Sequence, residues 1–561
     1  MPTDSLPVQV RVEGVRGEMR ANVMATLRLA REAREGRVLS RGEAERLHAR
    51  SPDQIRRALE PFGYYRPEVH SELTAERNHW QASYRVIPGE PVTITEVDVG
   101  IVGPGSGDPA LLEAVEGFLL RPGAPFRHPS YEQAKRRLQA TAAESGYLDA
   151  AFQERRVLVD PDRGTATVTL RLSTGERFHF GPVRFTGHDL DPRFLQSFVR
   201  FRPGEPISTP ALLELQNALQ ATGLFSSVEV ELRRGEAADL QVPVEVRLSP
   251  RPRRRYDGGA GYGTDTGPRA VLSGELRRLN SSGHGLVGEA RASLIQNGVN
   301  LSYVIPLPGA AGNRLGFTGG FLDERTLEVR STKATLGMGW HRGRGTWREV
   351  WLVDLQRERS GQEDEVQTST TLLPSVHWVR TGFDDPVHAT RGHRLRLELA
   401  GSHQSLISDV SFGRVSLRAG AIFSPWEDGR VLLRGEVGAA LVDEVTDLPV
   451  SFRFYAGGDR SVRGYAYRSL APTSPEGTPL GGRHLLVTSA EVEQIFWRGF
   501  GLAVFVDAGN ASRDWPVRPR VGTGAGLRWR SPVGLVRVDG AAAVSRPGTP
   551  WRLHLSVGPS L

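Results

Sequence analysis

The pattern of apolar and polar positions divides the chain into two parts with different periods. Up to about residue 250, segments with apolar residues at helical spacing alternate with segments in which every second residue is apolar. From about residue 251 the helical period disappears, and alternating segments of about ten residues follow one another, separated by Gly, Asp, Asn and Pro. The first part therefore predicts mixed helices and strands, and the second part predicts strands alone.

One helical unit recurs three times in the first part. Each predicted helix begins at a Ser or Thr with proline or a capping-box residue after it, and stops at a glycine. The starts and stops are Ser51 and Gly63, Ser130 and Gly146, and Thr209 and Gly223. The expected inward-facing residues are Ile55, Leu59, Tyr131, Ala134, Leu138, Leu212, Leu215 and Leu219. An alternating strand pair follows each helix, so we expect a threefold array of small βααββ modules.

Strict alternation in the second part predicts a closed barrel. Leu395, Leu397 and Leu399 share one face of a strand, while Arg394, Arg396 and Glu398 share the other. Around sixteen such segments, with no helices to cover a face, describe a barrel with lipid outside and a polar lumen inside. A seventeenth candidate at 451–454 is assigned to a long loop of residues 443–482, because bacterial barrels have an even number of strands.

The predicted fold class is therefore an α+β array of three modules followed by an all-β, sixteen-stranded transmembrane barrel. The expected boundaries are 1–90, 91–175 and 176–250 for the modules and 251–561 for the barrel.

Composition narrows the chemistry. The 561 residues contain no Cys, which excludes disulfides, Cys-ligated zinc, iron–sulfur clusters and thiol nucleophiles. The 64 Gly fit a barrel, where they relieve tight curvature and a crowded interior. The net charge of +7 comes from arginines interspersed with acids, so we expect no nucleic-acid partner. No metal and no cofactor is expected.

The first residues have neither a basic segment nor an apolar segment of the kind found in a signal peptide. Together with the predicted outer-membrane barrel, this pattern favours a mature chain that begins after a removed signal.

The long loop contains the most unusual stretch, residues 455–465. It includes two adjacent glycines and an Arg-Gly pair, and Gly464 would allow a tight turn that presents Arg463 as a projecting cation. The motif residues are Gly457, Gly458, Val462, Arg463, Gly464 and Tyr465.

This stretch resembles the Val-Arg-Gly-Tyr/Phe signature of the Omp85 superfamily of outer-membrane assembly and translocation proteins. Residues 505–510 and 526–534 resemble the two strand motifs that follow in that family. The three modules match its POTRA domains, and their number makes the chain most similar to the TamA (translocation and assembly module) branch. The last strand resembles a barrel-targeting signal, carried by Trp551, Leu553, Leu555, Val557 and Leu561.

The resemblance implies that the loop folds back into the lumen, where Arg463 contacts acids on the inner wall. Three acids are candidate partners: Asp507, which alternation places beside Phe505 on the thirteenth strand, and Glu491 and Glu493 on the twelfth. A buried guanidinium needs a carboxylate partner, and a bidentate partner also fixes its geometry. The resemblance further implies a lateral gate between the first and last strands.

The function implied is an outer-membrane protein that inserts or secretes β-barrel clients such as autotransporters, with its POTRA domains in the periplasm. The implied partners are an inner-membrane-anchored TamB-like protein, unfolded outer-membrane proteins and outer-membrane lipid. We expect that the protein is not an enzyme, because the chain lacks His-Glu-x-x-His, Gly-x-Ser-x-Gly and P-loop motifs.

Three alternatives stay open. A two-partner-secretion transporter resembles the chain in its barrel but carries two POTRA domains and a plug helix. A general barrel-assembly insertase belongs to the same superfamily. A passive porin is the most remote alternative, because a diffusion channel does not need three periplasmic interaction domains.

Overall fold

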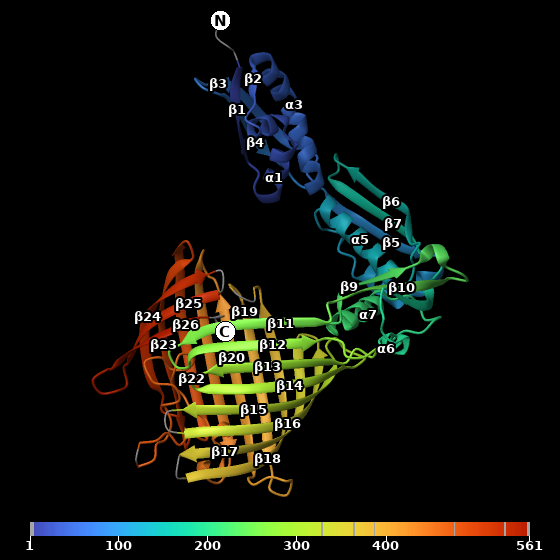
Figure 1. The fold of residues 1–561 in the computed structure, drawn as a ribbon. Coiled ribbons are helices and arrows are strands. Elements are labelled where there is room, and N and C mark those ends of the chain that lie inside the picture. Colours follow the sequence, from blue (N-terminus) through green and yellow to red (C-terminus); the bar gives the residue numbers. More distant parts are fainter. Residues whose placement is uncertain are drawn as a thin grey trace. The chain divides into compact units, whose positions relative to one another are not determined.

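The computed structural model describes residues 5–557 apart from 327–328, 363–364, 386–387, 476 and 532–533. It contains three small α/β modules followed by a closed barrel of sixteen strands (Figure 1). The predicted fold class is therefore confirmed. Among the described residues, no helix is both long enough and apolar enough to cross a membrane.

The first module is more elaborate than the predicted βααββ unit. Its four-stranded sheet has the order β2-β1-β4-β3, with β1 parallel to β4. The helices supply apolar residues to a core shared with β1 and β4. The strands are β1 (Ser5–Glu13), β2 (Val38–Ser40), β3 (Glu68–Ala75) and β4 (Trp80–Ile87), and the helices are α1 (Gly17–Thr26), α2 (Arg28–Arg34) and α3 (Arg41–Leu59).

The predicted helix start at Ser51 was wrong. Helix α3 begins earlier, because Glu43 Oε2 accepts hydrogen bonds from both the Ser40 backbone N–H (3.0 Å) and the Ser40 hydroxyl (2.8 Å). Pro52 lies inside this helix. The predicted stop is confirmed, since Gly63 adopts φ 90° directly after the 3₁₀ turn Glu60–Phe62.

The second and third modules have the predicted βααββ order, and each builds a three-stranded sheet, β5-β7-β6 and β8-β10-β9. Helix α5 begins at His128 with Pro129 in its first turn, so the predicted start at Ser130 was two residues late. The predicted inward faces are buried, except that Leu212 is half-buried. The elements are β5 (Thr93–Val102), α4 (Pro109–Glu116), α5 (His128–Glu144), β6 (Ala151–Asp160), β7 (Thr165–Ser173), β8 (His179–Thr186), α6 (Pro192–Gln196), α7 (Thr209–Ala221), β9 (Phe225–Leu232) and β10 (Gln241–Pro250).

Sixteen antiparallel strands, β11 to β26, close into the barrel. The first eight are β11 (Arg254–Gly263), β12 (Gly267–Leu276), β13 (Gly285–Ser293), β14 (Gln296–Pro306), β15 (Arg314–Thr326), β16 (Val329–Arg344), β17 (Trp347–Gln362) and β18 (Glu365–Phe383). The last eight are β19 (Gly392–Ser402), β20 (Phe412–Phe423), β21 (Gly429–Leu441), β22 (His484–Trp497), β23 (Phe500–Ser512), β24 (Arg520–Ser531), β25 (Gly534–Ala543) and β26 (Trp551–Val557). Residues 451–454 form no barrel strand, as predicted.

Burial alternates along the barrel strands as the sequence pattern requires. On β23 the side chains of Leu502, Val504 and Val506 are exposed, while their alternate neighbours Phe505 and Asp507 are buried. Apolar side chains that alternate with buried neighbours describe a lipid-facing surface. The wall therefore presents its apolar face outward and its polar face to the lumen.

One junction in the wall differs from the others. Strands β11 and β26 pair through a single residue pair, Gly263 with Ser556, among the described residues. The neighbouring β25–β26 ladder has seven pairs, and the β17–β18 ladder has sixteen. The β11–β26 junction, called the seam below, is therefore the weakest strand contact of the described barrel.

Candidate functional site

The segment between β21 and β22 packs against the inner wall of the barrel. Its apolar residues form one core with buried side chains of β18, β20 to β23 and β25. The loop contributes Leu448, Phe452, Phe454, Ala456, Val462, Tyr465 and Leu470, and the wall strands contribute Leu373, Phe412, Ala440, Leu485, Val487, Ala511 and Ala543. Burial of these side chains anchors the loop before any charge is considered.

Arg463 is bonded to three acids of the wall. Its Nε and Nη2 donate to the two carboxylate oxygens of Asp507 at 2.7 and 2.9 Å, a bidentate pair. Its Nη1 donates to Glu491 Oε2 at 2.7 Å and to Asp539 Oδ2 at 3.0 Å. The guanidinium carbon also lies 3.4 Å from the ring centroid of Phe505. Arg463 is 2% exposed, so all these interactions are shielded from bulk water.

Two further arginines complete an ion-pair network around Arg463. Arg528 on β24 donates to Glu491 Oε1 at 2.6 Å and to Glu493 Oε1 at 2.8 Å, and it also pairs with Asp539. The predicted contact between Glu493 and Arg463 was wrong: Glu493 pairs with Arg528 and with Arg430, whose Nε lies 2.9 Å from it. Alternation places a residue on the correct face but does not give its height along the strand, and Glu493 lies two residues further along β22.

Glycines make room for the loop backbone. Gly464 adopts φ 91°, a left-handed conformation that favours glycine, and a Cβ there would lie 3.0 Å from the backbone of Ala542 and Ala543. On the facing strand, a Cβ on Gly522 would lie 2.0 Å from the carbonyl oxygen of Arg463. The lumen of the barrel is therefore crowded, as expected, and the loop that carries Arg463 occupies part of it.

The rest of the motif packs around this turn. Gly457 and Gly458 also have positive φ, of 100° and 106°, and Val462 is fully buried. The Tyr465 hydroxyl donates to the carbonyl oxygen of Val521 at 3.4 Å.

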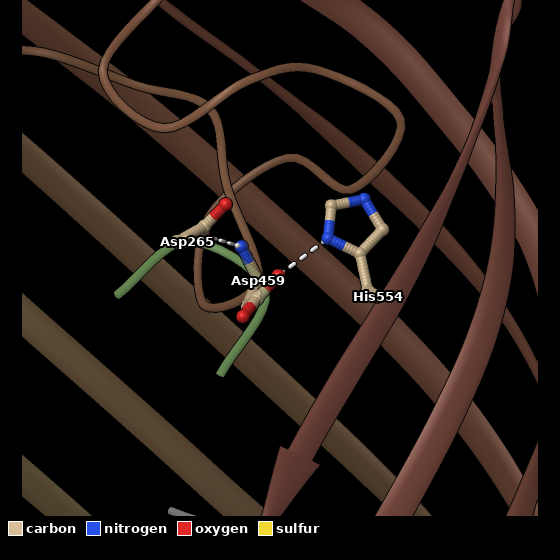
Figure 2. A group of neighbouring side chains, drawn as sticks. All are labelled: Asp265, Asp459 and His554. Atoms are coloured by element: carbon tan, nitrogen blue, oxygen red, sulfur yellow. Dashed lines mark hydrogen bonds and ion pairs between the residues drawn. The ribbon is translucent and has the colours of Figure 1, made fainter. Parts of the chain in front are cut away.

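A second group of side chains connects the loop to both sides of the seam (Figure 2). The backbone N–H of Asp459, in the loop, donates to Asp265 Oδ2 at 2.6 Å, and Asp265 lies in the turn after β11. The Asp459 carboxylate accepts a hydrogen bond from Nδ1 of His554, on β26. Gly464 N–H donates to Nε2 of the same imidazole at 2.9 Å. We call Asp265, Asp459 and His554 the clasp.

The clasp has the residue types of a metal site, with one candidate ligand atom from each residue within 4.8 Å of the others. The imidazole argues against that use. Because Nε2 accepts from Gly464, the neutral ring carries its proton on Nδ1, and Nδ1 then donates to Asp459 and has no lone pair for a metal. The group is therefore best described as a hydrogen-bonded bridge across the seam.

The terminal-strand residues predicted as a targeting signal lie on β26, except Leu561, which lies outside the described residues. Trp551 and Leu553 are strongly exposed, and the carbonyl oxygens of Leu555 and Val557 accept hydrogen bonds from Thr264 N–H (3.1 Å) and Arg269 (2.9 Å).

Together these features define a class: an outer-membrane β-barrel with POTRA-like modules and a long loop ion-paired to its inner wall. The chain belongs to the Omp85 superfamily, since the family model "Omp85 superfamily domain" matches residues 280–560. The model "POTRA domain TamA domain 1" matches residues 9–88, and the POTRA model "Surface antigen variable number repeat" matches residues 178–251.

Two curated relatives share the name outer membrane protein assembly factor BamA. The protein of Nitratidesulfovibrio vulgaris is 25% identical over 365 residues, 60% of this chain and 45% of the relative. That of Neisseria meningitidis serogroup B is 23% identical over 395 residues, 63% of this chain and 48% of the relative. The chain spans about half the length of the curated relatives it matches.

Among solved structures, BamA from Haemophilus ducreyi lacking POTRA domains 1-3 has the same fold. The TM-score is 0.64 at 17% identity, over 83% of this chain and 99% of that chain.

Proposed function

We propose that this protein helps to insert or secrete β-barrel client proteins, including autotransporters, at the outer membrane, and that it performs no chemical reaction of its own. The observation that carries the proposal is the way the loop is attached. Arg463 bonds the loop to the barrel wall, and the clasp bonds it to both sides of the seam. The seam strands themselves pair through one residue pair among the described residues. A seam held mainly by side chains can open without breaking a long ladder. Opening there would expose unpaired strand edges to a client strand.

The POTRA modules supply the partner-binding role. Their sheets have edge strands, β2 and β3 in the first, β5 and β6 in the second, and β8 and β9 in the third. An extended segment can add to such an edge through backbone hydrogen bonds, with little dependence on sequence. We propose that the modules lie in the periplasm and bind unfolded clients and a large, inner-membrane-anchored TamB-like partner.

Two branches of the superfamily compete for the finer assignment. The TamA-type POTRA match at residues 9–88 favours the TamA branch, while the names of the curated relatives favour a general barrel-assembly insertase. The three modules favour either over a two-partner-secretion transporter with two POTRA domains or a passive porin without them.

Locking the seam tests the proposal. Gly263 and Ser556 are directly opposed, and the chain has no Cys, so Gly263→Cys/Ser556→Cys introduces one defined disulfide. In liposomes, the full chain should accelerate folding of an autotransporter barrel, measured by the gel shift between heated and unheated samples. Oxidation of the cysteine pair should abolish this acceleration, and reduction should restore it.

The matched control is Ala270→Cys/Ala292→Cys, which locks the fully paired β12–β13 ladder. Its oxidised form should keep full activity. Full activity of the oxidised seam variant would refute lateral gating, and an absence of acceleration by the unmodified protein would refute the proposed function.

Client range separates the two branches. A TamA-type protein should accelerate autotransporter barrels more than porins, and the full chain should capture a large inner-membrane-anchored protein from envelope membranes. Equal acceleration of all barrels, without that capture, would favour the general insertase.

A further inference from the structure

A second charged region of the lumen is strongly cationic. It is a cavity of about 250 Å³ between the barrel wall and the tip of the loop. Its described lining contains six arginines and a single acid, Glu436. The arginines are Arg394, Arg396, Arg418, Arg434, Arg460 and Arg537.

Several of these arginines lack a charged partner. Arg418 pairs with Glu436 at 2.7 Å, and Arg396 pairs with Glu398 at 3.2 Å. Arg434 donates to a neutral group, the Ser489 hydroxyl, at 3.0 Å. Arg394 and Arg460 form no ion pair with any described residue. The Nε of Arg396 is buried and has no hydrogen-bond partner in the described part of the chain. The cavity therefore carries a large excess of positive charge.

An adjoining cavity extends this surface to the seam. It has a volume of about 560 Å³ and shares Arg418, Glu436, Arg460, Ser461 and Arg537 with the first cavity. Its lining adds four more arginines and two acids: Arg269, Arg414, Arg453, Arg468, Asp265 and Asp459. It also includes Gly263 and Ser556, the residue pair that closes the seam, and Val557 next to it. The cationic space thus reaches the weakest junction of the barrel wall.

Converging guanidinium groups repel one another, and their repulsion grows as water is excluded. A bound anion neutralises part of the positive charge and so removes the free-energy cost of this repulsion. Arginine presents a planar fork of N–H donors that matches the oxygens of a phosphate, and a phosphomonoester carries up to two charges on three acceptor oxygens. A volume of about 250 Å³ suits a small, dense anion better than a β-strand of a client protein.

We propose that this cavity is a binding site for phosphate groups, of the phosphomonoester or pyrophosphate type, which enter from the seam. Two sources share this chemistry: the headgroup of a membrane lipid, and free phosphate in solution. The site rests on the arrangement of the arginines alone and does not depend on the proposed assembly function.

Titration calorimetry on the detergent-solubilised full chain tests the site, with pyrophosphate as the probe in chloride buffer at constant ionic strength. The unmodified protein should bind pyrophosphate at one site. Arg394→Gln/Arg434→Gln should raise the dissociation constant about tenfold or more, because it removes two of the converging donors. Arg359→Gln removes the same type of charge from an exposed position on β17 and should leave binding unchanged.

Arg460→Gln provides a second variant, since Arg460 is an exposed loop residue whose replacement does not disturb the wall. It should also weaken binding. The heated-versus-unheated gel shift confirms that each variant is folded.

Competition between pyrophosphate and lipids distinguishes the two sources of phosphate. If phosphatidic acid in the micelle displaces pyrophosphate and diacylglycerol does not, the ligand is a lipid headgroup. If pyrophosphate binds and phosphatidic acid fails to displace it, the ligand is a free phosphate. The proposal is overturned if pyrophosphate binds no better than chloride, if the double variant binds as tightly as the Arg359 variant, or if a short glutamate peptide binds more tightly than pyrophosphate.

Discussion

Two charged regions of one lumen are built on opposite principles. Around Arg463, three arginines meet four carboxylates, and each arginine is bonded to at least one of those acids. In the cationic cavity, six arginines line the space between the wall and the loop together with one acid, Glu436. Burial explains the difference: the network excludes water, so each charge there needs a partner, while the cavity keeps open space that water or an anion can fill. The network fixes a position, and the cavity is suited to an exchangeable occupant.

Arg463→Ala should give the largest effect, because it leaves Asp507 buried without its bidentate partner. Removing one member of a buried ion pair costs about 3–5 kcal/mol. We expect a lower urea midpoint for the barrel and loss of client assembly, while insertion into the membrane is retained. Arg463→Lys, which keeps the charge but not the fork, should recover part of the stability. Normal client assembly by Arg463→Ala would contradict the role of the loop.

Asp507→Asn should have a smaller effect, because Glu491 and Asp539 still neutralise Arg463. Loss of a charge-assisted bidentate pair should lower the free energy of unfolding by about 1.5–3 kcal/mol, measured by urea titration. Asp514→Asn is the matched control: its pair with Arg483 is exposed, so the change should stay within about 0.5 kcal/mol. Equal changes in the free energy of unfolding for the two substitutions would contradict the expected difference between buried and exposed ion pairs.

His554→Ala tests the clasp, which lies where the cavity region meets the seam. The substitution removes the bonds to Asp459 and Gly464, so the seam should open more often. A loss of about 1 kcal/mol corresponds to an approximately fivefold larger open population. Conductance events in planar bilayers measure this population, and an unchanged event frequency would show that the clasp does not hold the seam.

Arg434→Gln should have the smallest effect and the opposite sign. Removing one guanidinium relieves repulsion in the cavity, and the barrel should be stabilised by about 0.5 kcal/mol at low salt. The gain should vanish at high sodium chloride, where the charges are screened. Melting temperatures at the two salt concentrations measure the effect, and a destabilised variant at low salt would show that the cavity is as well compensated as the network.

Periodicity was enough to predict the barrel, and the even number of strands in bacterial barrels reduced the seventeen alternating segments to sixteen strands. Alternation is a strong constraint when every strand has one face in lipid, and it also placed Asp507 on the inward face of the thirteenth strand.

Helix starts were harder to predict from the sequence than barrel strands. The Ser-Pro pair at Ser51 imitates a helix start, while the capping box at Ser40 and Glu43 determines the actual one.

Three members of the network were missed because their meeting depends on register between strands. Arg528, Asp539 and Arg430 lie on three different strands, and the height at which they meet is set by strand stagger. One signal was available: Arg528 shares a face of β24 with Gly522, Gly524 and Gly526. A face of glycines that ends in an arginine indicates a strand against which another backbone packs closely.

The clasp also bears on the order in which the protein forms. Arg463 and Asp507 are 44 residues apart in the chain, Asp459 and His554 are 95 apart, and Thr264 and Leu555 are 291 apart. Because closing a longer stretch of chain costs more entropy, the contacts across the seam are the slowest to form. His554 finds both of its partners only when the loop is already in place. Closure of the barrel is therefore coupled to correct placement of the loop, because a molecule with a misplaced loop lacks the two hydrogen bonds that His554 contributes from the last strand.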